Sequence, residues 1–176
     1  MSDRAGAVAE QVEELVRQAL ADVRDPEIPV CSIVDLGMVE DVRVAAEAVE
    51  VDLLPTFVGC PAKDVIGEDA TAAARQVSGG RDVRVRFVLD PPWTTDRITD
   101  RGRARLREYG ISPHWEQTAG PVVVPLMRAQ GVPCPYCGSD QTALESSWGA
   151  TPCRAVHYCR ACRNPFEGFK TKAPAP

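Results

Sequence analysis

The chain has 176 residues and a formal net charge of −5, with 44% hydrophobic and 26% charged residues. This length fits one compact domain plus a small module, the composition excludes an intrinsically disordered chain, and the negative charge argues against a protein that coats nucleic acid or binds anionic membranes. No apolar run reaches the ~18 residues of a transmembrane helix and the N-terminus lacks the apolar core of a signal peptide, so we expect a cytoplasmic protein without membrane partners.

Charge and Pro/Gly content divide the chain into parts. Residues 1–110 hold 14 Lys and Arg against 21 Asp and Glu, a net of −7, whereas the remaining residues hold 6 against 4, a net of +2. Between them, residues 111–130 are rich in proline and glycine and are predicted to form a linker. We therefore expect a first domain at 1–110, a second at 131–170 and a flexible tail at 171–176.

The first domain begins with an α-helix and two strands. Residues 8–23 repeat apolar side chains at helical spacing, and Pro26 is expected to end this helix. Residues 38–44 and 48–54 alternate apolar with charged residues, which is typical of a half-buried antiparallel pair.

A second helix is predicted to open at Pro61, to run to about residue 77 and to close at Gly79 and Gly80. Residues 83–89 alternate again and predict a third strand.

A last helix is predicted over residues 96–109, with Thr95 as its N-cap and Gly110 at its C-terminus. The resulting order α-β-β-α-β-α predicts a small two-layer α/β domain of the α+β kind.

Two carboxylates, Asp25 and Glu27, flank Pro26 directly after the first helix. The two prolines at 26 and 29 would stiffen a loop that presents oxygen ligands or hydrogen-bond acceptors. The same composition also fits a simple helix-ending turn, and the residues alone leave both interpretations open.

Cys60 lies in the turn that runs from Pro55 and Thr56 to the second predicted helix. A thiol next to a helix N-terminus is favoured as the thiolate, because unpaired backbone N–H groups and the helix dipole stabilise negative charge. Lys63 would add to this effect. Such a thiolate could bind a soft metal or act as a nucleophile, while a buried core cysteine is the alternative.

Five of the seven cysteines fall in the last 43 residues, and four of these form two CxxC pairs. Each pair can aim two sulfurs at one point, so together they supply the tetrahedral S₄ set that zinc prefers. A segment of this size is too small for a stable core of its own, so the metal would stabilise its fold. Iron, an iron–sulfur cluster or free thiols are the alternatives. The four predicted ligands are Cys134, Cys137, Cys159 and Cys162.

The remaining features are less specific. Cys31 is expected in the core because its neighbours are apolar, and Cys153 is either a buried residue of the ribbon or a thiol beside the metal. Arg97, Arg101 and Arg105 recur along one side of the last predicted helix, either as a solvated face or as a docking surface for an acidic partner. Basic residues near the CxxC pairs make nucleic-acid binding a weak alternative.

The motifs together resemble a known family. DPEIPVCSIVDLGMV, PTFVGCPA and VLDPPWTTDRITDRGRARLREYGISP are similar to the iron–sulfur assembly factors of the MIP18-like, SufT-related family. With CPYCGSDQT and CRACRNPFEGFK added, residues 7–170 resemble the PaaD-type proteins of phenylacetate degradation. The resemblance places the family's DPE loop on Asp25 and Glu27 and its reactive cysteine on Cys60, with Thr56 in the preceding turn, and implies a MIP18-like domain followed by a zinc ribbon.

The resemblance also implies a function. We expect an accessory or maturation factor of the multicomponent phenylacetyl-CoA ring epoxidase that assists iron–sulfur cluster assembly in the reductase component and has no catalytic activity of its own. The implied cofactors are a structural zinc ion and a transient iron–sulfur cluster or iron. Epoxidase components, above all the reductase, are the expected partners, with a homodimer if two chains share one cluster. A stoichiometric oxygenase subunit and a zinc-ribbon adaptor are the alternatives.

Overall fold

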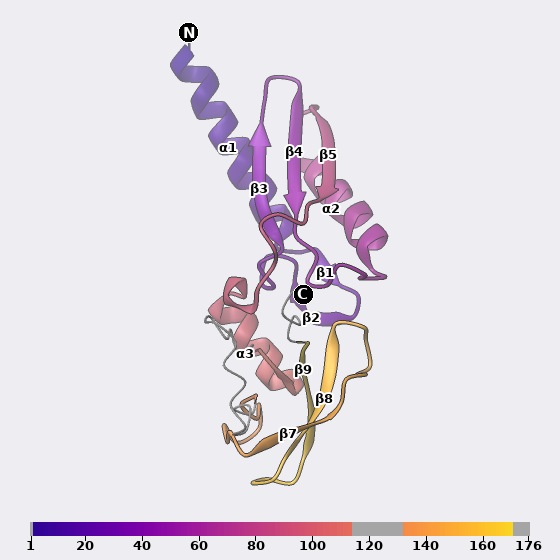
Figure 1. Cartoon of the computed structure of the whole chain (residues 1–176). Helices are drawn as coiled ribbons and strands as arrows, with labels where there is room; N and C mark the ends of the chain where they lie inside the picture. Colours follow the sequence, from indigo (N-terminus) through magenta and orange to yellow (C-terminus); the bar gives the residue numbers. More distant parts are fainter. Residues whose placement is uncertain (1, 114–131, 171–176) are drawn as a thin grey trace. The chain divides into compact units, whose positions relative to one another are not determined.

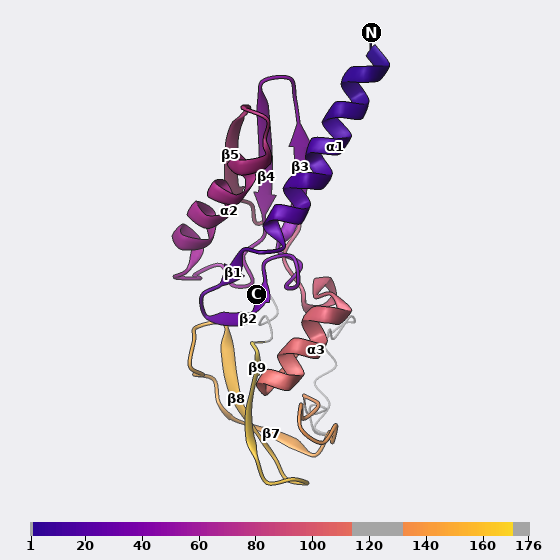
Figure 2. The same ribbon diagram turned by 180° about the vertical axis from the view of Figure 1, so that it is seen from behind.

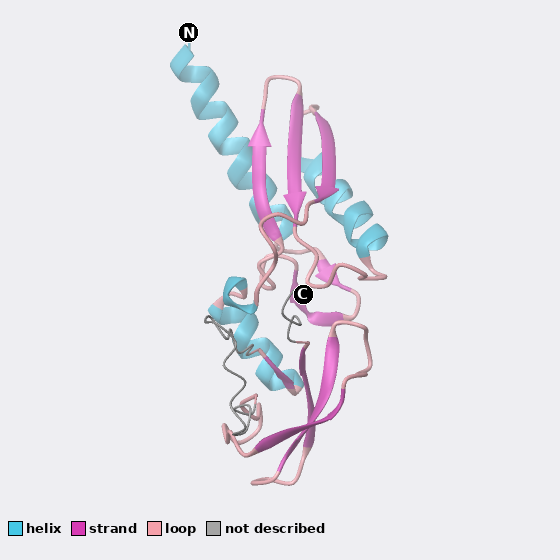
Figure 3. Cartoon of the chain, in the orientation of Figure 1, coloured by secondary structure: helices cyan, strands magenta, loops and turns pink. Residues whose placement is uncertain are grey.

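The computed structural model describes residues 2–113 and 132–170. The chain forms two compact units, Met1–Gly102 and Arg103–Pro176. Helices, strands and connecting loops are coloured in Figure 3, and both units combine helical residues with a β-sheet. The mixed α+β class predicted from the sequence is confirmed. Among the described residues, no helix is both long enough and apolar enough to cross a bilayer.

The first unit is built on a three-stranded sheet with the order β3-β4-β5. β3 (Val39–Val44) and β4 (Ala48–Leu53) are antiparallel, as predicted, and β5 (Asp82–Phe87) runs parallel to β4 after the crossover through α2 (Lys63–Val77). Figures 1 and 2 show that α1 (Ser2–Leu20) and α2 cover the same face of this sheet.

Side chains alternate across the sheet, as the period of a β-strand requires. Apolar residues of the strands are buried together with the apolar stripes of the two helices, while the other face carries an ion network around Asp52. The buried apolar set comprises Val16, Leu20, Val42, Val49, Val51, Leu53, Ile66, Ala70, Ala74 and Val83.

Helix α1 ends three residues earlier than predicted, at Leu20, and Pro26 does not terminate it. The chain leaves the helix through tighter bonds, because the N–H groups of Asp22 and Val23 bind the carbonyls of Ala19 and Leu20, each at 3.2 Å. Such i→i+3 bonds are the usual end of a helix.

The segment with two carboxylates forms a hairpin. β1 (Arg24–Asp25) and β2 (Ile28–Ser32) pair as antiparallel strands, with Asp25 opposite Ile28. The backbone hydrogen bonds therefore continue where we expected a loop or a simple turn.

The last predicted helix is divided into a 3₁₀ turn, Thr95–Arg97, and α3, Asp100–Tyr109. The predicted cap at Thr95 is wrong, because the hydroxyl of Thr99 accepts the N–H of Gly102 at 3.0 Å and caps α3 instead. The chain is extended at Ile98 between the two pieces. Gly110 follows α3 at φ 87°, which confirms its role at the helix end.

The loop after β2 is fastened to the start of α3. Asp35 is fully buried, and its carboxylate accepts bonds from the N–H of Ser32 at 3.1 Å and from Arg101 Nε at 2.6 Å. Arg97 bonds the carbonyl of Gly37 at 3.1 Å and also pairs with Glu40. Two members of the predicted arginine row are thus bound within the chain, and the docking role of the row stays a prediction.

The second unit contains a four-stranded sheet with the order β6-β9-β8-β7. β7 (Thr142–Ser146), β8 (Arg154–Cys159) and β9 (Pro165–Phe169) are antiparallel neighbours, and β6 (Ile111–Ser112) joins β9 in parallel. The first two residues of the expected linker thus lie in a strand. The rest of it from residue 114 and the expected tail lie outside the described residues.

Candidate metal centre and thiol site

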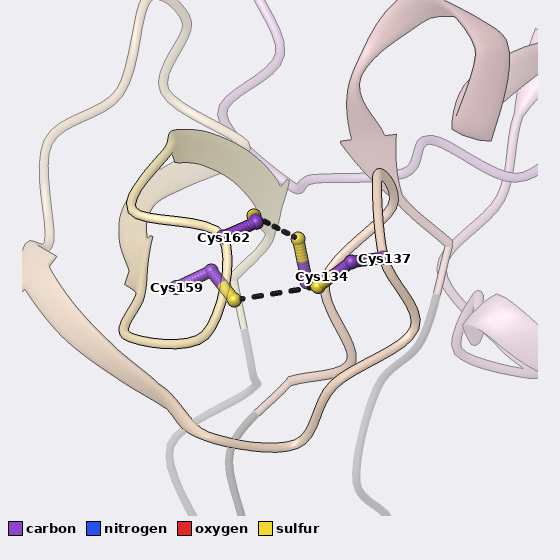
Figure 4. A group of neighbouring side chains, drawn as sticks. All are labelled: Cys134, Cys137, Cys159 and Cys162. Carbon is purple, nitrogen blue, oxygen red and sulfur yellow. Dashed lines mark hydrogen bonds between the residues drawn. The ribbon is translucent and has the colours of Figure 1, made fainter.

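Two knuckles of the same construction bring four cysteines together. In the first, the N–H of Gly138 bonds the carbonyl of Cys134 at 2.9 Å; in the second, the N–H of Arg163 bonds the carbonyl of Cys159 at 2.8 Å. Gly138 and Arg163 hold the same left-handed conformation, at φ 72° and φ 61°. The equivalent backbone geometry turns both CxxC pairs toward one point, as Figure 4 shows.

The sulfur positions fit a zinc ion. The four sulfurs lie within 4.8 Å of one another. The Sγ atoms of Cys134 and Cys162 are 3.7 Å apart, and those of Cys137 and Cys159 are 3.6 Å apart. A tetrahedral site with Zn–S bonds of ~2.3 Å requires S···S separations of about 3.8 Å, whereas a disulfide requires about 2.05 Å. The donor set, its spacing and its closure by four protein ligands therefore fit structural zinc.

The pKa values of the clustered thiols also indicate that the four cysteines need a bound cation to lose their protons together. Burial raises the pKa of Cys134 to about 12. Burial would also raise the pKa of Cys162, but hydrogen bonds from Asn164 and neighbouring cysteines lower it to about 7. Four thiolates this close repel one another, so full deprotonation requires a bound metal ion.

The metal centre is also the centre of the ribbon core. Cys134 and Cys159 are buried with Val132 and Phe166, and Cys162 packs against this group. The ligands were predicted from the sequence, but Arg163 and Asn164, which shape the second knuckle, were not. A glycine after the first pair was visible in the sequence, whereas nothing marked an arginine for a left-handed position.

Cys60 lies in a tight turn between β4 and α2, and 7% of it is exposed. Its N–H bonds the carbonyl of Phe57 at 3.0 Å, and Lys63 Nζ donates to the carbonyl of Val58 at 3.2 Å. Lys63 is the first residue of α2, so the helix begins two residues later than predicted at Pro61. Cys60 consequently precedes the helix by three residues, in a turn closed by backbone and lysine contacts.

Asp25 is buried, with 3% exposed, and its side chain is committed to the hairpin. One carboxylate oxygen accepts the N–H groups of Glu27 at 2.8 Å and Ile28 at 3.2 Å. Glu27 is half-buried at the tip of the hairpin. Asp25 therefore stabilises the turn of the hairpin, and a ligand role of Asp25 and Glu27 stays a prediction.

A path of backbone hydrogen bonds connects the hairpin to the end of β4. The N–H of Met38 bonds Ile33, and the N–H of Leu54 bonds Met38, at 2.9 Å and 2.7 Å. Thr56, half-buried, begins the turn that leads to Cys60. Figures 1 and 2 show the hairpin and this turn at the same end of the three-stranded sheet.

Comparisons with known proteins match both units. The iron–sulfur cluster assembly protein family matches residues 13–87, and the PaaD zinc beta ribbon domain matches residues 118–170, which include all four clustered cysteines. Over 152 residues the chain is 43% identical to a protein of Escherichia coli K12 named as a putative 1,2-phenylacetyl-CoA epoxidase subunit, covering 86% of this chain and 88% of that protein. The chain belongs to the PaaD family.

Shorter relatives and a solved structure match the first unit of this PaaD-family chain. An Fe-S protein maturation auxiliary factor of Porphyromonas gingivalis is 35% identical over 97 residues, which cover 54% of this chain and 91% of that protein. The crystal structure of a domain of unknown function, DUF59, from Bacillus anthracis superposes with a TM-score of 0.54 at 26% identity. It covers 57% of this chain and 96% of that chain, so the first unit shares the fold of that domain.

Proposed function

We propose that this protein is an accessory factor of a multicomponent phenylacetyl-CoA epoxidase and assists the assembly of iron–sulfur clusters in the reductase component. The main support for the proposal is that one chain contains both an iron–sulfur assembly module and a zinc-ribbon module. The first matches an iron–sulfur cluster assembly family, and the two together align with a protein named as an epoxidase subunit.

The chemistry assigned to the first unit is transient ligation of iron. Cys60 supplies a thiolate, and its thiol releases a proton to solvent when the iron–sulfur bond forms. Asp25 and Glu27 supply carboxylate oxygens as ligands or hydrogen-bond acceptors, and Thr56, in the turn before the cysteine, belongs to the same site. The cluster is the cargo of this reaction, and its transfer exchanges thiolate ligands without changing the oxidation state of iron.

One thiol does not hold a cluster by itself, because clusters of this kind are bound by four ligands. The missing ligands come from the client protein or from a second copy of this chain. The zinc ribbon is assigned a different task, since its four thiolates are closed around one metal and leave no position for cargo.

The test is cluster occupancy of the reductase in cells that express the epoxidase genes with wild-type protein or with Cys60→Ser. We expect Cys60→Ser to lower the iron and acid-labile sulfide of the purified reductase to the level found without the accessory protein. Cys153→Ser is the matched control, because Cys153 is also 7% exposed but lies in the ribbon and is not a clustered ligand. Unchanged occupancy in Cys60→Ser would refute the role of the thiol.

A second candidate is a stoichiometric subunit that takes part in turnover, which the word subunit in the name of the Escherichia coli relative favours. The two candidates differ in one assay. Purified epoxidase with its clusters already loaded is expected to be fully active without this chain if the chain is a maturation factor. Loss of activity on omission, restored by adding the chain, would support the subunit instead.

A further inference from the structure

Trp148 is an exposed aromatic residue on an ordered loop. It lies between β7 and β8, and 80% of it is exposed, the largest value among the exposed large hydrophobic residues of the described chain. A buried tryptophan removes ~150–250 Å² from water, so leaving it exposed forgoes several kcal/mol of hydrophobic stabilisation. The fold of the ribbon does not explain why an indole is placed here.

The backbone on both sides of Trp148 is held in place. The hydroxyl of Ser146 donates to the carbonyl of Trp148 and accepts its N–H, both at 3.0 Å. The next N–H, from Gly149, bonds the carbonyl of Arg154 at 2.9 Å, and that of Ala150 bonds a carboxylate oxygen of Glu167 at 2.6 Å. The loop that joins β7 to β8 in Figure 1 is therefore ordered by contacts within it and with β8 and β9.

An ion pair beneath the loop fixes it further. Arg154 pairs with Glu167 at 2.6 Å, and these side chains are only 6% and 22% exposed. Arg154 Nε also donates to the hydroxyl of Thr151 at 2.9 Å. Burying such a pair costs desolvation that its attraction only partly offsets, so it is better explained by the geometry it fixes than by stability.

Gly149 is required by the same arrangement. A Cβ atom there would lie 2.7 Å from a carboxylate oxygen of Glu167 and 2.8 Å from the carbonyl oxygen of Arg154. Any other residue would therefore displace the loop. A fixed backbone that presents one large aromatic side chain is the usual form of an interface anchor, because little entropy is lost on binding.

The charge beside the indole indicates the chemistry of the partner. Lys170 Nζ lies 4.7 Å from the centroid of the Trp148 ring. The ammonium covers one face of the ring. The rest of the indole is exposed and could enter an apolar pocket of a partner protein. A carboxylate at the rim of that pocket would pair with the ammonium while the indole is covered.

We infer that Trp148 and Lys170 form the anchor through which the ribbon docks on a protein partner that offers an apolar pocket with a carboxylate at its rim. This inference rests on the proposed function, which makes the epoxidase reductase that partner. The ribbon then recruits the client, while the first unit handles the cargo.

The test measures the affinity of the full-length, zinc-loaded protein for purified reductase. Trp148→Ala is expected to weaken binding by at least ~30-fold, the size of an interface hot spot. Lys170→Glu is expected to weaken it by about 10-fold through repulsion of the carboxylate. Leu89→Ala is the control, because Leu89 is 56% exposed and lies in the first unit. Each variant must retain the zinc content of the wild type.

Two further measurements separate a fixed anchor from a merely exposed tryptophan. Gly149→Ala keeps the indole but moves the loop, and we expect it to weaken binding to the reductase nearly as much as Trp148→Ala. Acrylamide quenching of Trp148 is expected to fall when the reductase is bound. Equal affinity of Trp148→Ala and wild type would overturn the inference and leave the proposed function intact.

Absence of binding by the wild type, or normal cluster occupancy in the reductase without this protein, would instead remove the proposed function. A blue shift of Trp148 emission on phosphatidylcholine–phosphatidylserine vesicles, with no shift on the reductase, would identify a membrane surface and overturn the inference.

Discussion

The two units of the chain are stabilised in different ways. Ten of the twelve largest fully buried side chains lie in the first unit and only Leu106 and Ile111 lie in the second, so the first has a conventional hydrophobic core. In the ribbon, by contrast, Cys134 and Cys159 are themselves core residues. Thiols can therefore serve different purposes in the two units of one chain. We therefore expect the fold of the ribbon to depend on its thiols and the fold of the first unit to depend mainly on its apolar side chains.

Of the predicted changes, removal of the metal is expected to have the largest effect on stability, and it tests whether the two units are stabilised differently. Chelation at neutral pH, or Cys159→Ser, is expected to unfold the ribbon, because apparent zinc binding in such modules contributes ~10–16 kcal/mol. The first unit should keep its native amide signals in NMR spectra while those of residues 132–170 collapse to unfolded positions. Cys153→Ser is the control and should retain zinc. A ribbon that stays folded without metal would remove the contrast between the units.

Alanine substitutions at two glycines would test the packing of the first unit. Gly102→Ala is expected to destabilise it by ~1–3 kcal/mol, because the added Cβ would lie 2.4 Å from the carbonyl oxygen of Asp35. Gly67→Ala should instead stabilise it by about 0.5–1 kcal/mol, since its Cβ would meet only Phe87 at 3.7 Å in a helix interior.

Thermal unfolding followed by far-UV circular dichroism measures both variants, because α1 and α2 supply most of the helical signal of the first unit. Zinc content should be equal in both. A loss of zinc in Gly102→Ala, or a change of the same sign in the two variants, would contradict this account of the packing.

The sequence predicted the three-stranded sheet of the first unit and the four clustered cysteines of the second. Alternation of apolar and charged residues located β3, β4 and β5, and the spacing of the CxxC pairs identified the metal ligands, because both patterns depend on local chain geometry. The errors lie where contacts between residues far apart in the sequence determine the secondary structure. Asp35 accepts the N–H of Thr99 and binds Arg101, and this divides a helix that local propensity alone would continue through residues 96–109.

Some local side-chain contacts were also missed in the first unit. The carboxylate of Asp25 bonds within its own hairpin, and Lys63 reaches back five residues to the carbonyl of Val58, but the residue types there leave several partners open. In the second unit the strand β6 escaped prediction because its partner β9 lies more than 50 residues later in the sequence. The role of Cys60 stays a prediction that the cluster-occupancy experiment decides.

The ion network on the open face of the sheet makes the smallest expected contribution. Asp52, whose side chain is 10% exposed, pairs with Arg86 at 2.6 Å and with Arg43 at 2.9 Å. The hydrogen bond from Arg86 is the main cause that lowers the pKa of Asp52, and burial opposes it. Because the side chains of Arg86 and Arg43 are 64% and 40% exposed, solvent screens both ion pairs. We therefore expect Asp52→Asn to lower the free energy of unfolding by only ~1 kcal/mol at neutral pH.

The pH dependence follows from the sign of that shift. A carboxyl whose pKa is lower in the folded state stabilises the fold fully above its unfolded pKa, near 3.8, and loses this effect as the pH falls through the folded value. Urea unfolding should therefore separate wild type from Asp52→Asn at about pH 7 and bring them together in acid, as the pH falls below the lowered pKa of Asp52. Asp41→Asn is the control and should change stability less, since the side chain of Asp41 is 46% exposed and pairs only with Arg43 among the described ion pairs. A difference for Asp52→Asn that persists unchanged in acid would mean that packing around the side chain, not its charge, stabilises this face of the sheet.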